Sequence, residues 1–270
     1  MVIGNREFEI GNRCYIMGIL NVTPDSFSDG GLWQDIDKAL CHTENMINDG
    51  ADIIDVGGES TRPGHEAITV SEELDRVIPA IEAITKRFDL PVSVDTSKST
   101  VAEAALSAGA VMVNDVWGLK RDPEMANVIA RNNAACCLMH NREEINYNNF
   151  LEDMLRDLSQ SVKIALDAGI EPERIILDPG IGFKKTVEMN LEAINRLDLV
   201  AQLGYPVLLG ASRKSFIGKI LDLPSTERIE GTLVATVIAI MRGCSFVRVH
   251  DVKEAKRTII MTEAILYARK

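Results

Sequence analysis

Acidic and amide side chains follow short apolar runs of this chain, at the point where each run ends. Asp95, Asn114 and Asp178 are the clearest cases. Two carboxylates and an amide in one pocket would suit a flat heterocycle rich in N–H donors, because a carboxylate accepts two hydrogen bonds in a fork. Each residue could instead cap the following helix or close a turn, and this alternative stays open for any one of them.

A basic pair lies near the C-terminus, on the last apolar run. Arg248 and His250 alternate there, so both side chains face the same side of a strand. After the last strand of an eight-stranded barrel, this pair would lie where such folds commonly bind phosphate. A surface arginine and a structural histidine remain the alternative when each residue is considered alone.

The elements that must position these groups form a repeat. Eight short apolar runs lack alternation, which is typical of parallel strands buried on both faces. Amphipathic stretches separate them, and a glycine follows several of these stretches, as a left-handed helix cap requires. The pattern predicts a single α/β domain over residues 1–270, a (β/α)8 TIM barrel, with a doubly wound sheet as the rival. The runs are centred near residues 16, 54, 94, 113, 137, 176, 208 and 247.

Two local expectations accompany the barrel. Residues 1–13 are predicted to form a small hairpin that covers the bottom of the barrel. Asp122 and Pro123 are typical of the first turn of a helix, which is expected to run to about Asn132.

Composition limits the possible partners. The formal net charge of −11 argues against binding to a nucleic-acid backbone, so an anionic ligand would need a local basic cluster or a metal. The five cysteines are scattered, without a CxxC pair, as expected for reduced thiols. The N-terminus lacks the apolar core of a signal peptide, and the apolar runs are too short to span a bilayer. We therefore expect a cytoplasmic protein that does not bind membranes.

The polar strings after five of the runs, together with Phe246–Asp251, closely resemble the dihydropteroate synthase family. That resemblance covers roughly Tyr15 to Lys270 and implies a folate-pathway transferase. The family joins a pterin, supplied as 6-hydroxymethyl-7,8-dihydropterin pyrophosphate, to para-aminobenzoate. The five strings are Asn21–Gly31, Gly57–Gly64, Asp95–Lys98, Asp178–Gly182 and Gly210–Ser215.

The resemblance also implies a role for each matching residue. Asp178 and Asn114 would bind the amino-pyrimidine edge of the pterin, Lys214 its oxo edge and Asp95 the far ring. Thr61, Arg248 and His250 would bind the pyrophosphate, and Asn21 would hold Mg²⁺ through its amide oxygen. The residues expected to act in catalysis are Asp95, Lys214 and Arg248.

The family binds para-aminobenzoate, and sulfonamide-type inhibitors that mimic it, between two front loops. The matching residues here are Phe27, Arg62, Pro63, Phe183 and Ser215. From the residues alone, the two loops could be plain surface. The family also forms homodimers through its last helices, which fits the apolar stretches Ile229–Met241 and Ile259–Ile265. One departure is the fifth loop, where many relatives carry a Gly-Thr-Pro turn that this chain lacks.

Three other functions fit part of the pattern. A pterin-dependent methyltransferase acting on a corrinoid shares the pterin-binding Asp and Asn positions, but has less reason to keep the basic groups. A metal-dependent barrel hydrolase needs clustered His ligands, and the four histidines here include no His-x-His pair. A non-catalytic pterin-binding protein would be expected to lose a pterin or pyrophosphate residue, and none is lost.

Overall fold

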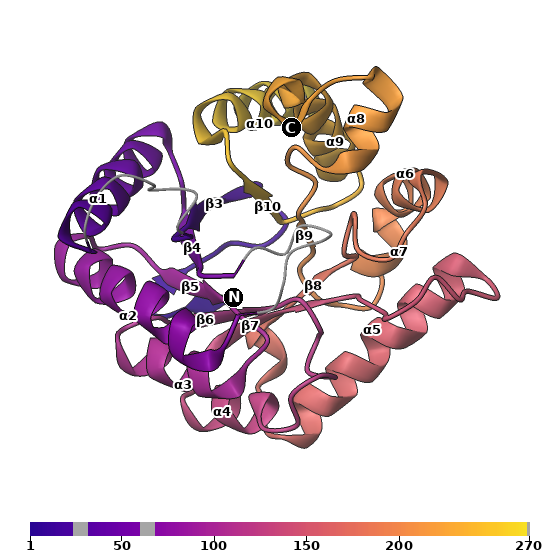
Figure 1. The fold of residues 1–270 in the computed structure, drawn as a ribbon. Helices are drawn as coiled ribbons and strands as arrows, with labels where there is room; N and C mark the ends of the chain where they lie inside the picture. The colour runs from indigo at the N-terminus through magenta and orange to yellow at the C-terminus, as the bar shows by residue number, and fades with distance from the viewer. Residues whose placement is uncertain (24–31, 60–67, 269–270) are drawn as a thin grey trace.

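The computed structural model describes residues 1–23, 32–59 and 68–268. Eight parallel strands form its central sheet, in the order β8-β7-β6-β5-β4-β3-β10-β9. A parallel bridge between Leu177 and Val207 joins the two ends of this order, so the sheet curves into a nearly closed barrel (Figure 1). The strands are β3 (Tyr15–Asn21), β4 (Ile53–Gly57), β5 (Val92–Asp95), β6 (Met112–Asp115), β7 (Ala135–Met139), β8 (Ile175–Asp178), β9 (Leu208–Leu209) and β10 (Phe246–Val249).

Helices surround the barrel and cover the outer face of its strands (Figure 1). Each connection between consecutive strands carries at least one of them, which confirms the predicted (β/α)8 barrel. The helices are α1 (Leu32–Asp49), α2 (Val70–Arg87), α3 (Ser99–Ser107), α4 (Met125–Arg131), α5 (Phe150–Asp167), α6 (Val187–Asn195), α7 (Leu197–Ala201), α8 (Ser215–Leu221), α9 (Ile229–Met241) and α10 (Val252–Leu266), with 3-10 turns η2 (Pro172–Arg174) and η3 (Ser225–Glu227).

Local chemistry accounts for several helix ends. Thr69 and Glu72 form a capping box at the start of α2, in which each side chain accepts a backbone N–H of the other residue. The expected helix after Asp122 begins only at Met125, because the Asp122 side chain accepts the N–H of Glu124 and closes a turn ahead of the helix. The prediction of a helix was therefore right, but its start, expected at Pro123 after an Asp122 cap, was two residues too early.

Two apolar clusters stabilise the barrel. The larger one lies between strands and helices, and the smaller one fills the barrel interior near the strand starts. Strands β1 (Val2–Ile3) and β2 (Arg6–Glu7) form the predicted antiparallel hairpin. Its Ile3 and the following Phe8 are buried in the inner cluster, where the Phe8 ring lies 4.8 Å from that of Tyr15 and 5.7 Å from that of Phe246. The hairpin thus covers the barrel bottom, as predicted.

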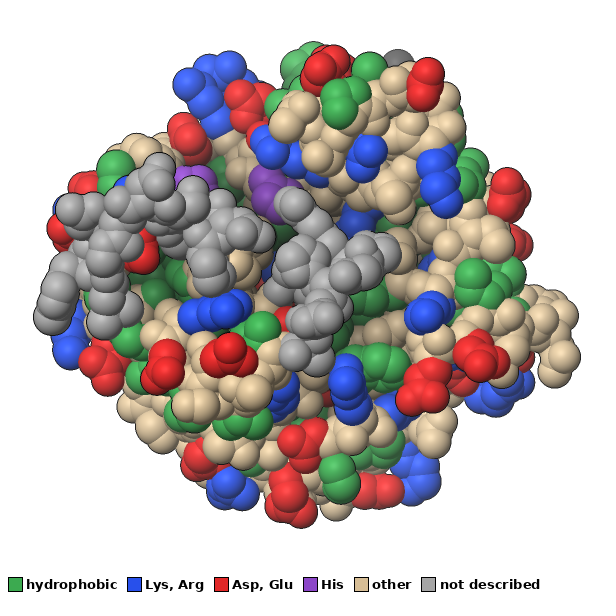
Figure 2. All heavy atoms as spheres, viewed as in Figure 1, with side chains coloured by type: hydrophobic (Ala, Val, Ile, Leu, Met, Phe, Trp, Pro, Cys, Tyr) green, Lys and Arg blue, Asp and Glu red, His purple; other side chains and the backbone are tan. Residues whose placement is uncertain are grey.

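Acidic and basic side chains are interspersed on the face of the barrel shown in Figure 2. Neither negative nor positive charge therefore dominates this face, although the net charge of the chain is −11. Among the described residues, none of the helices has the length and apolar character needed to cross a membrane.

Candidate active site

Strand register brings three of the polar strand ends into one row, with Gly57 between the first two. Asn21 pairs with Gly57, Gly57 with Asp95, and Asp95 with Asn114 across four neighbouring strands. Asp178 ends β8, which lies beyond β7 on the same side of the sheet. Since all strands are parallel, these residues meet at the carboxyl end of the barrel, where active sites of this fold lie.

A buried ionic network occupies the centre of this end. The Arg248 guanidinium donates from Nε to Asp55 Oδ2 (2.6 Å) and from Nη2 to Asp95 Oδ2 (2.7 Å). Asn114 Nδ2 donates to the same Asp55 oxygen at 3.0 Å. Asp55 is fully buried, so the guanidinium supplies the positive charge that a buried carboxylate needs.

The network also fixes the direction of the Asn114 amide. Because its Nδ2 group donates to Asp55, its oxygen is turned the other way. The described residues supply no hydrogen bond to that oxygen. Asn114 therefore presents an acceptor to a ligand, and the buried Asp55 is what orients it.

Burial raises the pKa of Asp95 to about 7, although the nearby charge of Arg248 favours the ionised form. For Arg248, burial alone would lower the pKa, but the charges of Asp55 and Asp95 raise it above its ordinary value. The guanidinium therefore stays charged, whereas the Asp95 carboxyl can take up a proton near neutral pH.

Asp178 is held at one oxygen and open at the other. Gly180 N–H donates to Asp178 Oδ1 at 2.7 Å, while Oδ2 has no hydrogen-bond partner among the described residues. A side chain at Gly210 would lie 3.4 Å from Oδ2, so the glycine keeps the space beside this oxygen free. Burial raises the pKa of Asp178 to about 6. At pH 7 the carboxylate is ionised and can accept from a ligand.

Lys214 lies over the Phe183 ring, with its Nζ 4.4 Å from the ring centroid, an arrangement that favours a cation. Burial and, as the second cause, the charge of Arg248 lower the pKa of Lys214 to about 8. The charges of Asp178 and Asp95 act in the opposite direction and keep the ammonium form favoured at neutral pH. Phe183 and Lys214 thus belong to one side of the site.

The remaining predicted residues within the described ranges lie around this centre. His250 follows β10, and its Nδ1 lies 2.9 Å from Ser212 Oγ. Ser215 is exposed at the start of α8, directly after Lys214. Asn21 is half-buried at the end of β3, and its side-chain oxygen lies near Gly57, whose added Cβ would be 3.8 Å away. Four predicted residues lie outside the described residues: Phe27, Thr61, Arg62 and Pro63.

A metal held by protein side chains alone has no support in the described part of the chain. No group of three or more His, Cys, Asp or Glu there could hold an ion. The Asn21 amide oxygen has no hydrogen-bond partner among these residues, so it fits a cation that takes most of its ligands from water and phosphate.

Sequence reasoning missed one residue of the site, Asp55. It had a signal, because a carboxylate inside the apolar run Ile53–Val56 must find a partner when the strand is buried.

Comparisons with known proteins agree with this geometry. The model of a family described as "Pterin binding enzyme" matches residues 17–250. A dihydropteroate synthase of Clostridium beijerinckii is 60% identical over 267 residues, 98% of this chain and 99% of the relative. The crystal structure of dihydropteroate synthase from Clostridium difficile in the presence of pteroic acid superposes with a TM-score of 0.94 and 50% identity, covering 96% of this chain and 99% of that one. The Yersinia pestis dihydropteroate synthase in complex with a sulfonamide drug gives a TM-score of 0.92 and 38% identity, covering 99% of both chains.

Replacing Asp55 by Asn should destabilise the folded protein. The amide keeps the size of the side chain but removes a charge from the buried network around Arg248, whose second carboxylate, Asp95, remains. We expect a loss of about 1–3 kcal/mol in the free energy of unfolding, measured by urea denaturation. Glu82→Gln, which breaks an exposed ion pair with Lys86, is the control and should leave the midpoint unchanged. Equal midpoints for Asp55→Asn and wild type would show that the network does not stabilise the fold.

Proposed function

The chain belongs to the pterin binding enzyme family, and we propose that it carries out the dihydropteroate synthase reaction with the buried groups described above. In this reaction, para-aminobenzoate and 6-hydroxymethyl-7,8-dihydropterin pyrophosphate give 7,8-dihydropteroate and pyrophosphate, a step of folate biosynthesis. The amine nitrogen forms a bond to the exocyclic methylene carbon of the pterin. The carbon–oxygen bond breaks, pyrophosphate leaves with the bonding electrons, and the amine gives its proton to solvent.

The observation that carries the pterin site is a pair of open acceptors on two buried residues. The Asp178 Oδ2 and Asn114 side-chain oxygens have no hydrogen-bond partner among the described residues. The amino group and ring N–H of a pterin are donors that would pair with both. Lys214 donates to the oxo edge of the same ring. A corrinoid methyltransferase could use these acceptors too, but the relatives reported above are synthases.

The leaving group is stabilised by cations. Arg248 retains N–H groups beyond the two that bind Asp55 and Asp95, and His250 and Thr61 complete the pyrophosphate site. Asn21 would hold Mg²⁺, which would supply positive charge to the leaving pyrophosphate. Asp95 lies beside the far ring of the pterin and stabilises the positive charge that develops on the methylene as pyrophosphate departs. An arylamine is already neutral at pH 7, so the reaction needs no strong general base.

The second substrate binds on the side of Lys214. Phe183 and Ser215, with Phe27, Arg62 and Pro63, form the proposed para-aminobenzoate pocket, and sulfonamides would compete there as arylamine mimics. The support within the described residues is that Phe183 lies under Lys214 and Ser215 follows it in the chain. The five free thiols support action in the reducing cytoplasm.

The last two long helices support a homodimer. Side chains of α9 and α10 expose large apolar groups, among them Val234 (63%), Ile260 (56%) and Ile265 (64%). These residues are of the type that a protein interface buries. We therefore propose that two copies of the chain associate through this face.

The reaction itself provides the first test. We expect release of pyrophosphate from the dihydropterin substrate to require para-aminobenzoate and to yield dihydropteroate, followed by chromatography. EDTA should stop the release and Mg²⁺ restore it, and Asn21→Ala should raise the Mg²⁺ concentration needed for half-maximal rate. Release that is indifferent to para-aminobenzoate would contradict the function, whereas indifference to EDTA would contradict only the metal proposal.

Asp178→Asn should weaken binding of a pterin without phosphate. The amide replaces one acceptor by a donor that faces a ring N–H, so we expect a loss of about 2–4 kcal/mol, measured by calorimetry. Acid should act in the same direction, because protonation of Asp178 below its pKa of about 6 also removes the acceptor. Wild-type affinity should therefore fall about fivefold between pH 6 and pH 5, while the variant changes much less. Affinity of the variant within twofold of wild type would rule out this role.

Sedimentation velocity at micromolar concentration tests the dimer. Wild type should sediment with twice the chain mass, and Ile260→Glu should shift it toward the monomer because a charge would be buried in the interface. Ile145→Glu, an exposed isoleucine away from α9 and α10, is the control and should remain a dimer. A monomeric wild type would refute the proposal.

A further inference from the structure

Lys185 is a buried lysine whose ammonium lies under the turn that follows Asp178. Its Nζ donates to Gly180 O at 2.8 Å and to Phe183 O at 3.1 Å, and lies 2.9 Å from His140 Nδ1. Only 9% of the residue is exposed. One side chain therefore joins the end of β7 to both ends of the turn between Gly180 and Phe183.

The surroundings of this group suit an ammonium. A protonated lysine has three N–H donors, and four acceptors lie within reach: the three above and His140 O at 3.4 Å. Burial lowers the pKa of Lys185 to about 7, although the charge of Asp178 favours the protonated form. A buried ammonium is costly unless it is hydrogen-bonded, and these acceptors supply the bonds that stabilise it here.

The turn that Lys185 holds contacts two groups of the pterin site, Asp178 and Lys214. Its first part supplies the Gly180 N–H that binds Asp178 Oδ1. Its last part supplies the Phe183 ring, over which Lys214 lies. The turn is also seated tightly against β7: Gly180 has φ +70, and a Cβ added there would lie 2.0 Å from His140 O. A small shift of this turn would therefore move the acceptor on one side of the ligand and the donor on the other.

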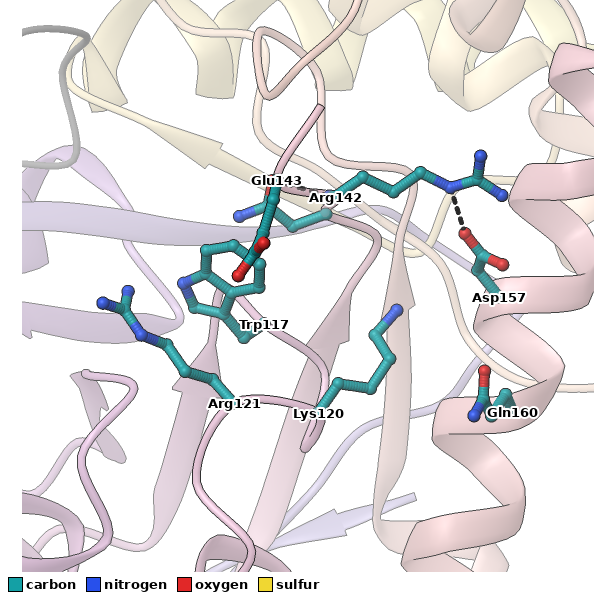
Figure 3. A pocket seen from close by; sticks show the side chains of 8 residues that line it. Trp117, Lys120, Arg121, Arg142, Glu143, Asp157 and Gln160 are labelled. Carbon is teal, nitrogen blue, oxygen red and sulfur yellow. Dashed lines mark hydrogen bonds and ion pairs between the residues drawn. The ribbon is translucent and has the colours of Figure 1, made fainter. Parts of the chain in front are cut away.

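His140 and Asp157 fix the far side of the lysine. Burial lowers the pKa of His140 to about 4, so the imidazole is neutral at pH 7. With Nδ1 accepting from Lys185, the proton is on Nε2, which lies 3.2 Å from Asp157 Oδ2. Arg142 Nε donates to the same oxygen at 2.7 Å, the contact drawn in Figure 3. Asp157 thus orients the imidazole so that the lone pair of Nδ1 faces Lys185.

Asp157 and Arg142 lie at the surface end of this chain of contacts. They line a hollow of about 340 Å³ beside α5 (Figure 3). The residues assigned above to the pterin and pyrophosphate do not line it. Its full lining is Trp117, Lys120, Arg121, Asn141, Arg142, Glu143, Asp157 and Gln160.

We propose that Lys185 is a positioning residue of the pterin site: its ammonium, oriented by His140 and Asp157, holds the turn that positions the pterin acceptor Asp178 and, through the Phe183 ring, the pterin donor Lys214. The inference rests on the proposed function, because it assigns Lys185 a role in binding the same substrate. Lys185 does not touch the reacting atoms. It acts on pterin affinity and leaves the pyrophosphate groups on β10 unaffected.

Lys185→Met tests the proposal, since it keeps the length of the side chain and removes all three donors. Lys184→Met is the matched control, because Lys184 is the exposed neighbour in the same turn. Calorimetry should show 6-hydroxymethylpterin binding at least tenfold more weakly to Lys185→Met, with pyrophosphate and Mg²⁺ binding within twofold of wild type. In steady-state kinetics, KM for the dihydropterin substrate should rise about tenfold, while kcat stays within threefold. Lys184→Met should match wild type throughout.

If Lys185→Met does not fold, Asp157→Ala tests the positioning role of Lys185 instead. Asp157→Ala removes the acceptor that orients His140, and should weaken the pterin about threefold without changing pyrophosphate binding. Asp167→Ala, which removes an exposed carboxylate from the same helix, should have no effect.

The outcomes separate the two proposals. Wild-type pterin affinity in both Lys185→Met and Asp157→Ala would overturn the positioning role, and so would an equal loss for pterin and pyrophosphate, which indicates general damage to the fold. Failure of wild type to bind the pterin at all would count against the proposed function instead.

Discussion

Eight parallel strands closed into a ring must all end on the same face, and the whole site depends on this constraint. Closure satisfies the backbone of each strand through its neighbours, so the strands can be buried on both sides. It also makes the row of Asn21, Gly57, Asp95 and Asn114 a consequence of register. The residues that contact the ligand need no proximity in sequence, because the barrel supplies it.

Ion pairs stabilise the charged side chains at this buried end of the barrel. Arg248 lies between Asp55 and Asp95, and the carboxylate that has no direct part in ligand binding, Asp55, both compensates the guanidinium and directs the Asn114 amide. Burial at the same time raises the pKa of Asp95 and Asp178 and lowers that of Lys214. The protonation states of these three groups depend on their surroundings, so they respond to a ligand that brings its own hydrogen-bond donors and charges.

A second layer of polar contacts supports the first. The turn after β8 is held from below by Lys185, which is held by His140 and Asp157 in turn. A short glycine-containing turn has little rigidity of its own, so the orientation of Asp178 depends on groups that never meet the ligand. The geometry of the site therefore depends on side chains of the surrounding scaffold.

Local signals are enough to predict the eight strands, the barrel, the N-terminal hairpin and the positions of Asp95, Asn114 and Asp178 at strand ends. Periodicity, apolar runs and the placement of glycine and proline can be read along the chain. The pairing of Arg248 with Asp55, 193 residues away, and the burial of Lys185 rather than Lys184 follow only from the folded barrel. Closure of the barrel determines which side chains face each other, and a buried charge is costly when it is left unpaired. Neither the contact nor the burial exists in the unfolded chain.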